Sequence, residues 1–230
     1  MTPTDRIIVA LDFPSIDEAR SMTAQLRGRV GVFKIGMELV YSGGLELARE
    51  LAGQGDQVFL DLKLLDIGHT VMSATKAVSR LGVSFLTVHA VDEKTLLAAV
   101  EGRGDTALKL LGVTVMTNLD GGDLRQQGVV ALSPRDLAQK RAVMAARCGF
   151  DGVITSGHEA TVLRQSLGME KLIITPGIRP VGADIGDQSR VMSPAQAVLA
   201  GADYLVIGRP ITQANDPVQA VEMIAEELAS

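Results

Sequence analysis

The chain has 230 residues, of which 47% are hydrophobic and 21% are charged, a composition that excludes an intrinsically disordered protein. Its 22 Lys and Arg against 27 Asp and Glu give a net charge of −5 with His neutral. This acidic balance argues against a nucleic-acid partner, because nucleic acids are bound by basic surfaces.

Short runs rich in β-branched residues recur along the whole chain and are typical of buried strands. We expect strands at 6–11, 32–36, 57–61, 85–89, 109–116, 152–155, 172–175 and 204–207. Amphipathic segments separate these runs and indicate helices near 16–27, 38–53, 68–81, 92–101, 134–148, 158–167, 194–200 and 216–228.

Several of these helices have recognisable start signals. Ser15 precedes the first helix, and Ser-Pro pairs at Ser133 and Ser193 precede the fifth and the seventh. The longest irregular stretches are about 118–132 and 177–192, and we expect a lid within the second, at 182–190.

Strands that alternate with helices predict βαβ crossovers and a parallel sheet. Eight such units in 230 residues fit a closed (β/α)₈ TIM barrel, and no linker or change of composition divides the chain, so residues 1–230 are expected to form one catalytic domain. A doubly wound open sheet is the alternative.

The chain shows no leader-like segment and no apolar run of membrane-spanning length, so we expect a cytoplasmic protein without a membrane partner. Its single cysteine, Cys148, lies in a run of small apolar residues, and we expect it to be buried in the core.

Charged residues interrupt the predicted strands near their carboxyl ends, where barrel active sites lie. Asp12 follows the first strand, Lys34 interrupts the second, and Asp61 and Lys63 stand two residues apart, which places them on one side of an extended chain. Asp66 follows before the next helix. Any one of these could be a rim charge or a helix cap, but buried opposite charges are costly and indicate a functional cluster.

Such a cluster has a definite chemistry. Like charges at about 4 Å repel by roughly 4 kcal/mol at an effective dielectric of 20, and a lysine between them offsets this repulsion. An ammonium held by carboxylates can donate a proton to a carbanion, while the same carboxylates oppose a substrate carboxylate. The combination suits loss of CO₂ followed by protonation of the carbon.

A second pattern lies in the last third of the chain, after the seventh and eighth predicted strands. The seventh ends in TPGIR with Arg179, and the eighth in IGRPI with Gly208 and Arg209. In barrels the loops after these two strands often bind phosphate, for which arginine offers a bidentate fork. We therefore expect a phosphate site there, with Gln188 of the predicted lid within reach.

Taken together, these residues resemble the bacterial type of the orotidine 5′-phosphate decarboxylase family. The D-x-K-x-x-D element belongs to a wider superfamily, and its combination with the other stretches is what makes the resemblance specific. The matching stretches run in order along nearly the whole chain: IIVALDFP, VFKIGMEL, VFLDLKLLDIGHTV, LTVHA, GVTVMT, ITPGIRP, GDQSR and YLVIGRPIT.

The resemblance implies decarboxylation of orotidine 5′-phosphate (OMP) to uridine 5′-phosphate (UMP), with roles for the matching residues. It makes Lys63 the proton donor to C6 of the pyrimidine and places Asp61 beside the substrate carboxylate. Asp66 would come from the partner subunit together with Thr70 and touch the ribose, and Lys34 would link the ribose hydroxyls to Asp61.

For the rest of the ligand, the resemblance makes Asp12 a ribose-binding carboxylate and Thr117 a contact of the pyrimidine. His89 matches the family as well, and we interpret it as structural. The remaining ligand-binding positions, which lie at or near the phosphate, are Arg179, Gln188, Gly208 and Arg209.

The resemblance also implies a homodimer with each active site at the subunit interface, and no metal or organic cofactor. Two rivals stay open. One is a Mg²⁺-dependent sugar-phosphate decarboxylase or hexulose-phosphate synthase of the same superfamily, although Lys34 stands where a metal site would want a carboxylate and only Glu38 lies near. The other is a non-catalytic barrel that binds nucleotide as a sensor.

Overall fold

Eight parallel strands close into a barrel in the computed structural model, which describes residues 1–180 and 192–229. Each strand pairs with the next, and β8 pairs with β1, which excludes the open-sheet alternative. The strands are β1 (Ile7–Ala10), β2 (Val32–Gly36), β3 (Val58–Leu64), β4 (Phe85–His89), β5 (Lys109–Val113), β6 (Gly152–Ile154), β7 (Leu172–Thr175) and β8 (Tyr204–Ile207).

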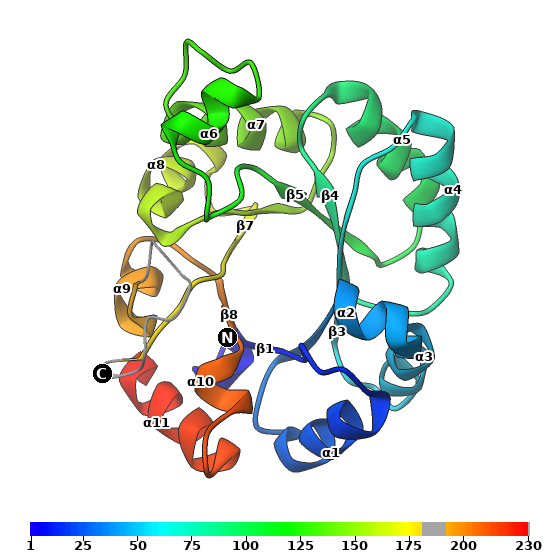
Figure 1. Ribbon diagram of the computed structural model, residues 1–230, viewed down its shortest axis with the longest axis vertical. Coiled ribbons are helices and arrows are strands. Elements are labelled where there is room, and N and C mark those ends of the chain that lie inside the picture. The colour runs from blue at the N-terminus through cyan, green and yellow to red at the C-terminus, as the bar shows by residue number, and fades with distance from the viewer. Residues whose placement is uncertain (181–191, 230) are drawn as a thin grey trace.

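The helices form a ring outside the barrel (Figure 1). They are α1 (Ile16–Leu26), α2 (Met37–Leu39), α3 (Leu45–Gly53), α4 (Gly68–Ser79), α5 (Glu93–Arg103), α6 (Gly121–Gln126), α7 (Pro134–Arg147), α8 (Gly157–Leu167), α9 (Pro194–Leu199), α10 (Arg209–Thr212) and α11 (Pro217–Ala229). A short 3₁₀ turn, Thr4–Arg6, precedes β1. No helix in the described part of the chain combines the length and apolarity that crossing a membrane requires.

The predicted start signals are confirmed at all three serines. The side chains of Ser15, Ser133 and Ser193 each accept a backbone N–H in the first turn of α1, α7 and α9. These bonds satisfy donors that a helix otherwise leaves unpaired at its amino end.

Several of the predicted elements differ from the structure, among them the strand expected over 57–61, which continues to Leu64. The helix expected over 38–53 is broken into α2 and α3 by a kinked turn, Val40–Gly44, in which Gly43 adopts a φ of 96°. The stretch 118–132, expected to be irregular, contains α6, which begins with a capping box at Asp120. The strand expected over 109–116 ends at Val113.

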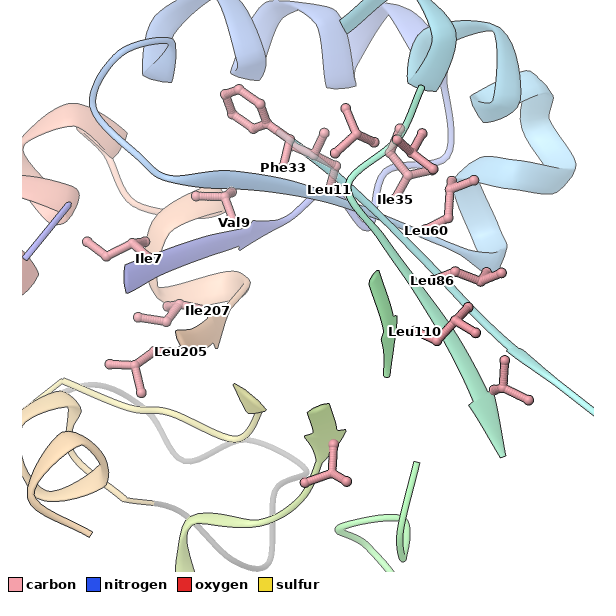
Figure 2. Packing of buried hydrophobic residues seen from close by; sticks show 14 of the residues in the cluster. Ile7, Val9, Leu11, Phe33, Ile35, Leu60, Leu86, Leu110, Leu205 and Ile207 are labelled. Carbon is pink, nitrogen blue, oxygen red and sulfur yellow. The ribbon is translucent and has the colours of Figure 1, made fainter. Parts of the chain in front are cut away.

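Alternate residues of each strand face opposite sides, and the two faces build two apolar layers. The outward side chains pack under the helices, where Cys148 is also buried as expected. Figure 2 shows part of this layer, with the labelled side chains Ile7, Val9, Leu11, Phe33, Ile35, Leu60, Leu86, Leu110, Leu205 and Ile207.

The inward side chains fill the barrel itself. Phe59, Phe85 and Tyr204 pack edge to face, with ring centroids 6.1 and 5.7 Å apart, among aliphatic residues from the other strands. The interior is therefore a packed core and not a pore.

Partly buried polar contacts join the amino ends of β7 and β8. Arg164 of α8 donates to the carbonyls of Gly168, Lys171 and Gly201 and forms an ion pair of 2.5 Å with Asp203, directly before β8. The Asp203 carboxylate also accepts the backbone N–H of Ile173 in β7. This network ties α8 to the amino ends of two strands.

Candidate active site

The inward positions of the strands change from apolar to polar toward the carboxyl ends. Phe59 of β3 is followed on the same face by Asp61 and Lys63, and Phe85 of β4 by Thr87 and His89. On β2, Val32 is followed on the same face by Lys34 and Gly36. On β1, Ile8 is followed by Ala10 and then by Asp12, just after the strand. On β8, Tyr204 is followed by Val206 and then by Gly208, also just after the strand. Strand geometry thus gathers the polar groups at one end of the barrel.

Four of these groups form a chain of alternating charge. Lys34 Nζ lies 3.2 Å from Asp12 Oδ1 and 3.6 Å from Asp61 Oδ2, and Lys63 Nζ lies 2.8 Å from Asp61 Oδ1. The Lys34 side chain is 8% exposed and that of Asp61 16% exposed, so the contact between these two is poorly screened by water, whereas the Asp12 side chain is 57% exposed. The predicted grouping of Asp12, Lys34, Asp61 and Lys63 is confirmed.

The Asp61 carboxyl is ionised in this environment. Burial alone would raise its pKa, but the charges of Lys34 and Lys63, with hydrogen bonds from Lys63 and Thr87, outweigh burial and hold the pKa below its ordinary value of 3.8. At neutral pH the cluster therefore contains a fixed negative charge between two lysines.

Two cavities open beside this cluster and share Asp61, Pro176 and Val206 in their walls. The first, of about 210 Å³, has mostly apolar walls from β3, β5 and β6, with Lys63 and the predicted Thr117 among them. Such a wall suits a flat ring with few polar contacts.

The second cavity, of about 230 Å³, is polar and cationic. Its walls include Asp12 and Lys34 together with Arg179, Gly208 and Arg209. The predicted phosphate-site residues of the described chain therefore lie together. Gln188 and the predicted lid at 182–190 lie outside the described residues.

Asp66 and Thr70 are not brought to the cluster within this chain. Both are exposed, Asp66 in the turn after β3 and Thr70 on α4, and neither lines the two cavities in the described structure. The Asp66 carboxylate accepts the backbone N–H of Ile67 at 2.6 Å, which fixes the turn before α4.

His89 ends β4 as expected and is half buried beside the cluster. Burial lowers its pKa, and the nearby cations Lys63 and Arg141 lower it further against the opposing effect of Asp61. The imidazole is therefore neutral at pH 7.

Two residues of the site were missed by sequence reasoning. Thr87 is fully buried and its hydroxyl donates to Asp61 Oδ1 at 2.9 Å. At Gly36, a Cβ would lie 3.0 Å from Asp12 Oδ1 and 3.2 Å from Lys34 Nζ, so glycine leaves room for that pair. The period of two could have found both, because Thr87 shares a face with His89 and Gly36 with Lys34.

A closed (β/α)₈ barrel with alternating carboxylates and ammonium groups at the carboxyl ends of its strands has the architecture of a barrel enzyme, whose active site lies at that end. A sequence profile described as "Orotidine 5′-phosphate decarboxylase / HUMPS family" matches residues 5–224. The chain belongs to this family.

Individual relatives agree over nearly the full length. The chain is 50% identical over 225 residues to an orotidine 5′-phosphate decarboxylase of Rhodopseudomonas palustris (strain BisB5), covering 98% of this chain and 95% of the relative. It is 48% identical over 230 residues to one of Bradyrhizobium sp. (strain BTAi1 / ATCC BAA-1182), covering 100% and 94%. The crystal structure of orotidine 5′-phosphate decarboxylase from Lactobacillus acidophilus superposes with a TM-score of 0.85 at 35% identity, covering 97% of this chain and 99% of that one.

Proposed function

We propose that this protein, acting as one catalytic domain, decarboxylates OMP to UMP and CO₂ in pyrimidine biosynthesis. The observation that supports this most directly is the position of Lys63 and Asp61, which face an apolar cavity that adjoins a cationic one. The pyrimidine, with Thr117 against it, would occupy the first cavity. The phosphate would occupy the second, held by Arg209, Arg179, the backbone at Gly208, and Gln188.

The chemical step needs only groups of the protein. The bond from C6 to the carboxylate breaks, the electron pair stays on C6, and Lys63 Nζ gives a proton to that carbon and later regains one from water. Asp61 lies close to the leaving carboxylate, and the repulsion between the two ends when neutral CO₂ departs. Lys34 and Asp12 hold the ribose hydroxyls and keep Asp61 in place.

Binding energy far from the reacting carbon contributes to the same step. The phosphate contacts hold the nucleotide so that C6 meets Lys63, and binding energy used for this purpose raises turnover instead of affinity.

We also propose a homodimer in which Asp66 and Thr70 complete the partner's site at the ribose. Both residues are exposed, and neither lines the two cavities described in their own chain. Leu65 and Ile67, on either side of Asp66, are 54% and 73% exposed, which favours burial of this turn against a second copy.

The rival function is Mg²⁺-dependent chemistry on a sugar phosphate, since the name of the matching family also includes the HUMPS group. The Lys34 ammonium argues against it, because this cation lies between the two carboxylates that a metal ion would need. In the described chain no three His, Cys, Asp or Glu side chains are placed to share a metal ion.

An ultraviolet assay of OMP consumption, run with and without EDTA, tests the proposal. We expect OMP to be consumed at the same rate in both. Lack of OMP turnover would contradict the proposed function and leave the nucleotide-binding sensor, while activity on a sugar phosphate that EDTA abolishes would establish the rival.

A further inference from the structure

The strand that holds Asp61 and Lys63 is irregular at these residues. On β3 the ladder with β4 pairs Leu60 with Leu86 and then Leu64 with Val88, so β3 advances four residues where β4 advances two. The extra residues form a bulge that contains both Asp61 and Lys63. Bulges next to active sites redirect side chains.

The bulge includes an uncommon backbone conformation. Lys63 has a φ of 50°, the left-handed region, and is the one residue other than glycine with a positive φ in the described chain. For a residue with a Cβ, this conformation costs about 1–3 kcal/mol and persists where the surroundings hold it in place.

The side chain of Thr87 holds this bulge at two points. Thr87 lies between the two β4 residues that pair on either side of the bulge, and it is 0% exposed. Its Oγ1 accepts the backbone N–H of Lys63 at 2.9 Å and donates to Asp61 Oδ1, also at 2.9 Å. The hydroxyl thus replaces the ladder partner that the bulge removes from Lys63.

We propose that Thr87 is a positioning residue for the reaction, which fixes the Lys63 main chain and the Asp61 carboxylate with one hydroxyl. Thr87 is buried and lines neither cavity of the described structure, so it acts through the other two residues. Asp61 Oδ1 receives both the Thr87 hydroxyl and the Lys63 ammonium, which lies at 2.8 Å. This inference rests on the proposed function.

The test compares Thr87→Val, which keeps the shape but lacks the hydroxyl, with Thr87→Ser, which keeps the hydroxyl. We expect Thr87→Val to lower kcat for OMP about tenfold to a hundredfold, because Lys63 and Asp61 lose their alignment with C6. The KM should change little, since phosphate and ribose contacts are untouched, and Thr87→Ser should restore most of the kcat.

Thr114→Val is the matched control. Thr114 is also buried and directly follows β5, the neighbour of β4. Its hydroxyl donates to the Ile154 carbonyl at 3.0 Å, so this variant loses one hydrogen bond outside the charge cluster. We expect it to keep the wild-type kcat. If Thr87→Val does not fold, Thr87→Ala removes the same hydroxyl without placing a methyl group against Asp61.

Each outcome bears on the inference. A folded Thr87→Val or Thr87→Ala enzyme with wild-type kcat would overturn it, and so would a Thr87→Ser enzyme as impaired as the valine variant. Equal losses in Thr87→Val and Thr114→Val would reduce Thr87 to a structural role. A wild-type protein that does not consume OMP would instead contradict the proposed function.

Discussion

The chemistry proposed here depends on single residues whose charge is set by their neighbours. Asp61 has two cations and a hydroxyl around it, and each lysine has a carboxylate partner at 3.6 Å or less. Because the contacts interlock, removing one charge changes the surroundings of the others, and substitutions in the cluster should not be additive.

Lys63→Ala tests the proton donor. We expect turnover of OMP to fall by about 10⁴-fold, near the upper end for a general acid, while UMP still binds through its phosphate and ribose. Steady-state kinetics and equilibrium binding of UMP give the two measurements. Lys140→Ala, which removes an exposed lysine on α7, is the control, and substantial residual turnover in Lys63→Ala would remove Lys63 from its role.

Arg209→Ala tests the phosphate site. Loss of a charge-assisted contact should lower kcat/KM for OMP about tenfold to a hundredfold. Orotidine, which has no phosphate, should react equally well with both enzymes. Equal losses for the two substrates would show that Arg209 does not bind the phosphate.

The depressed pKa of Asp61 predicts a pH dependence of stability. The ionised carboxylate stabilises the fold fully above its unfolded pKa, near 3.8, and this contribution is lost as the pH falls through the lower folded pKa. The difference in free energy of unfolding between wild type and Asp61→Asn should therefore shrink in acid, because the unfolded chain takes up the proton before the folded one does. Urea unfolding of both proteins at about pH 6 and about pH 3 measures this difference. A difference that stays the same at the two pH values would contradict the predicted loss of stabilisation in acid.

At the scale of elements, period-two strands and capped helices were enough to predict the barrel. Lys34 and Asp61 lie at inward positions because side chains alternate along a strand, and each residue stands two positions after an inward apolar residue. The bulge in β3 was not predictable from pattern, since nothing local marks Lys63 for a left-handed backbone; the strand continues to Leu64 where an end at Asp61 was expected.

The period of two places Thr87 and Gly36 on the inward face, but the contacts that they make depend on neighbouring segments of the barrel. Thr87 is important because it lies opposite the bulge in β3 and accepts the backbone N–H of Lys63. Gly36 is important because the side chains of Asp12 and Lys34 come together beside it. The placement of Asp66 and Thr70 in a partner's site came from the family resemblance and stays a prediction.

Gly36→Ala tests how β2 accommodates the ribose-binding pair. A methyl group 3.0 Å from Asp12 Oδ1 and 3.2 Å from Lys34 Nζ should push these side chains apart. Both contacts are ends of movable side chains, so stability should change little while kcat/KM for OMP falls about tenfold. Thermal unfolding and steady-state kinetics give the two measurements.

The control for this variant is Gly53→Ala at the end of α3, where a Cβ meets nothing within 4 Å. It should leave kinetics unchanged and stabilise the fold by a few tenths to about 1 kcal/mol. Wild-type kinetics in Gly36→Ala would show that the pair tolerates displacement.

At the scale of the whole molecule, the proposed dimer predicts complementation between inactive chains. In a random mixture of Lys63→Ala and Asp66→Ala protomers, about half of the dimers are hybrids, and two-fold symmetry gives each hybrid one intact site. About a quarter of all sites should therefore recover after subunit exchange. Absence of recovery, with exchange confirmed by mass spectrometry, would place Asp66 in the site of its own chain.

The Arg164 network lies at the amino ends of β7 and β8, and the charge cluster lies near the carboxyl ends of the strands. The barrel therefore places this polar network and the charge cluster at opposite ends of the strands. Laboratory evolution could therefore raise the melting temperature through substitutions at the amino ends of the strands and leave the charges at their carboxyl ends unchanged. In this chain a gain in thermal stability need not lower turnover.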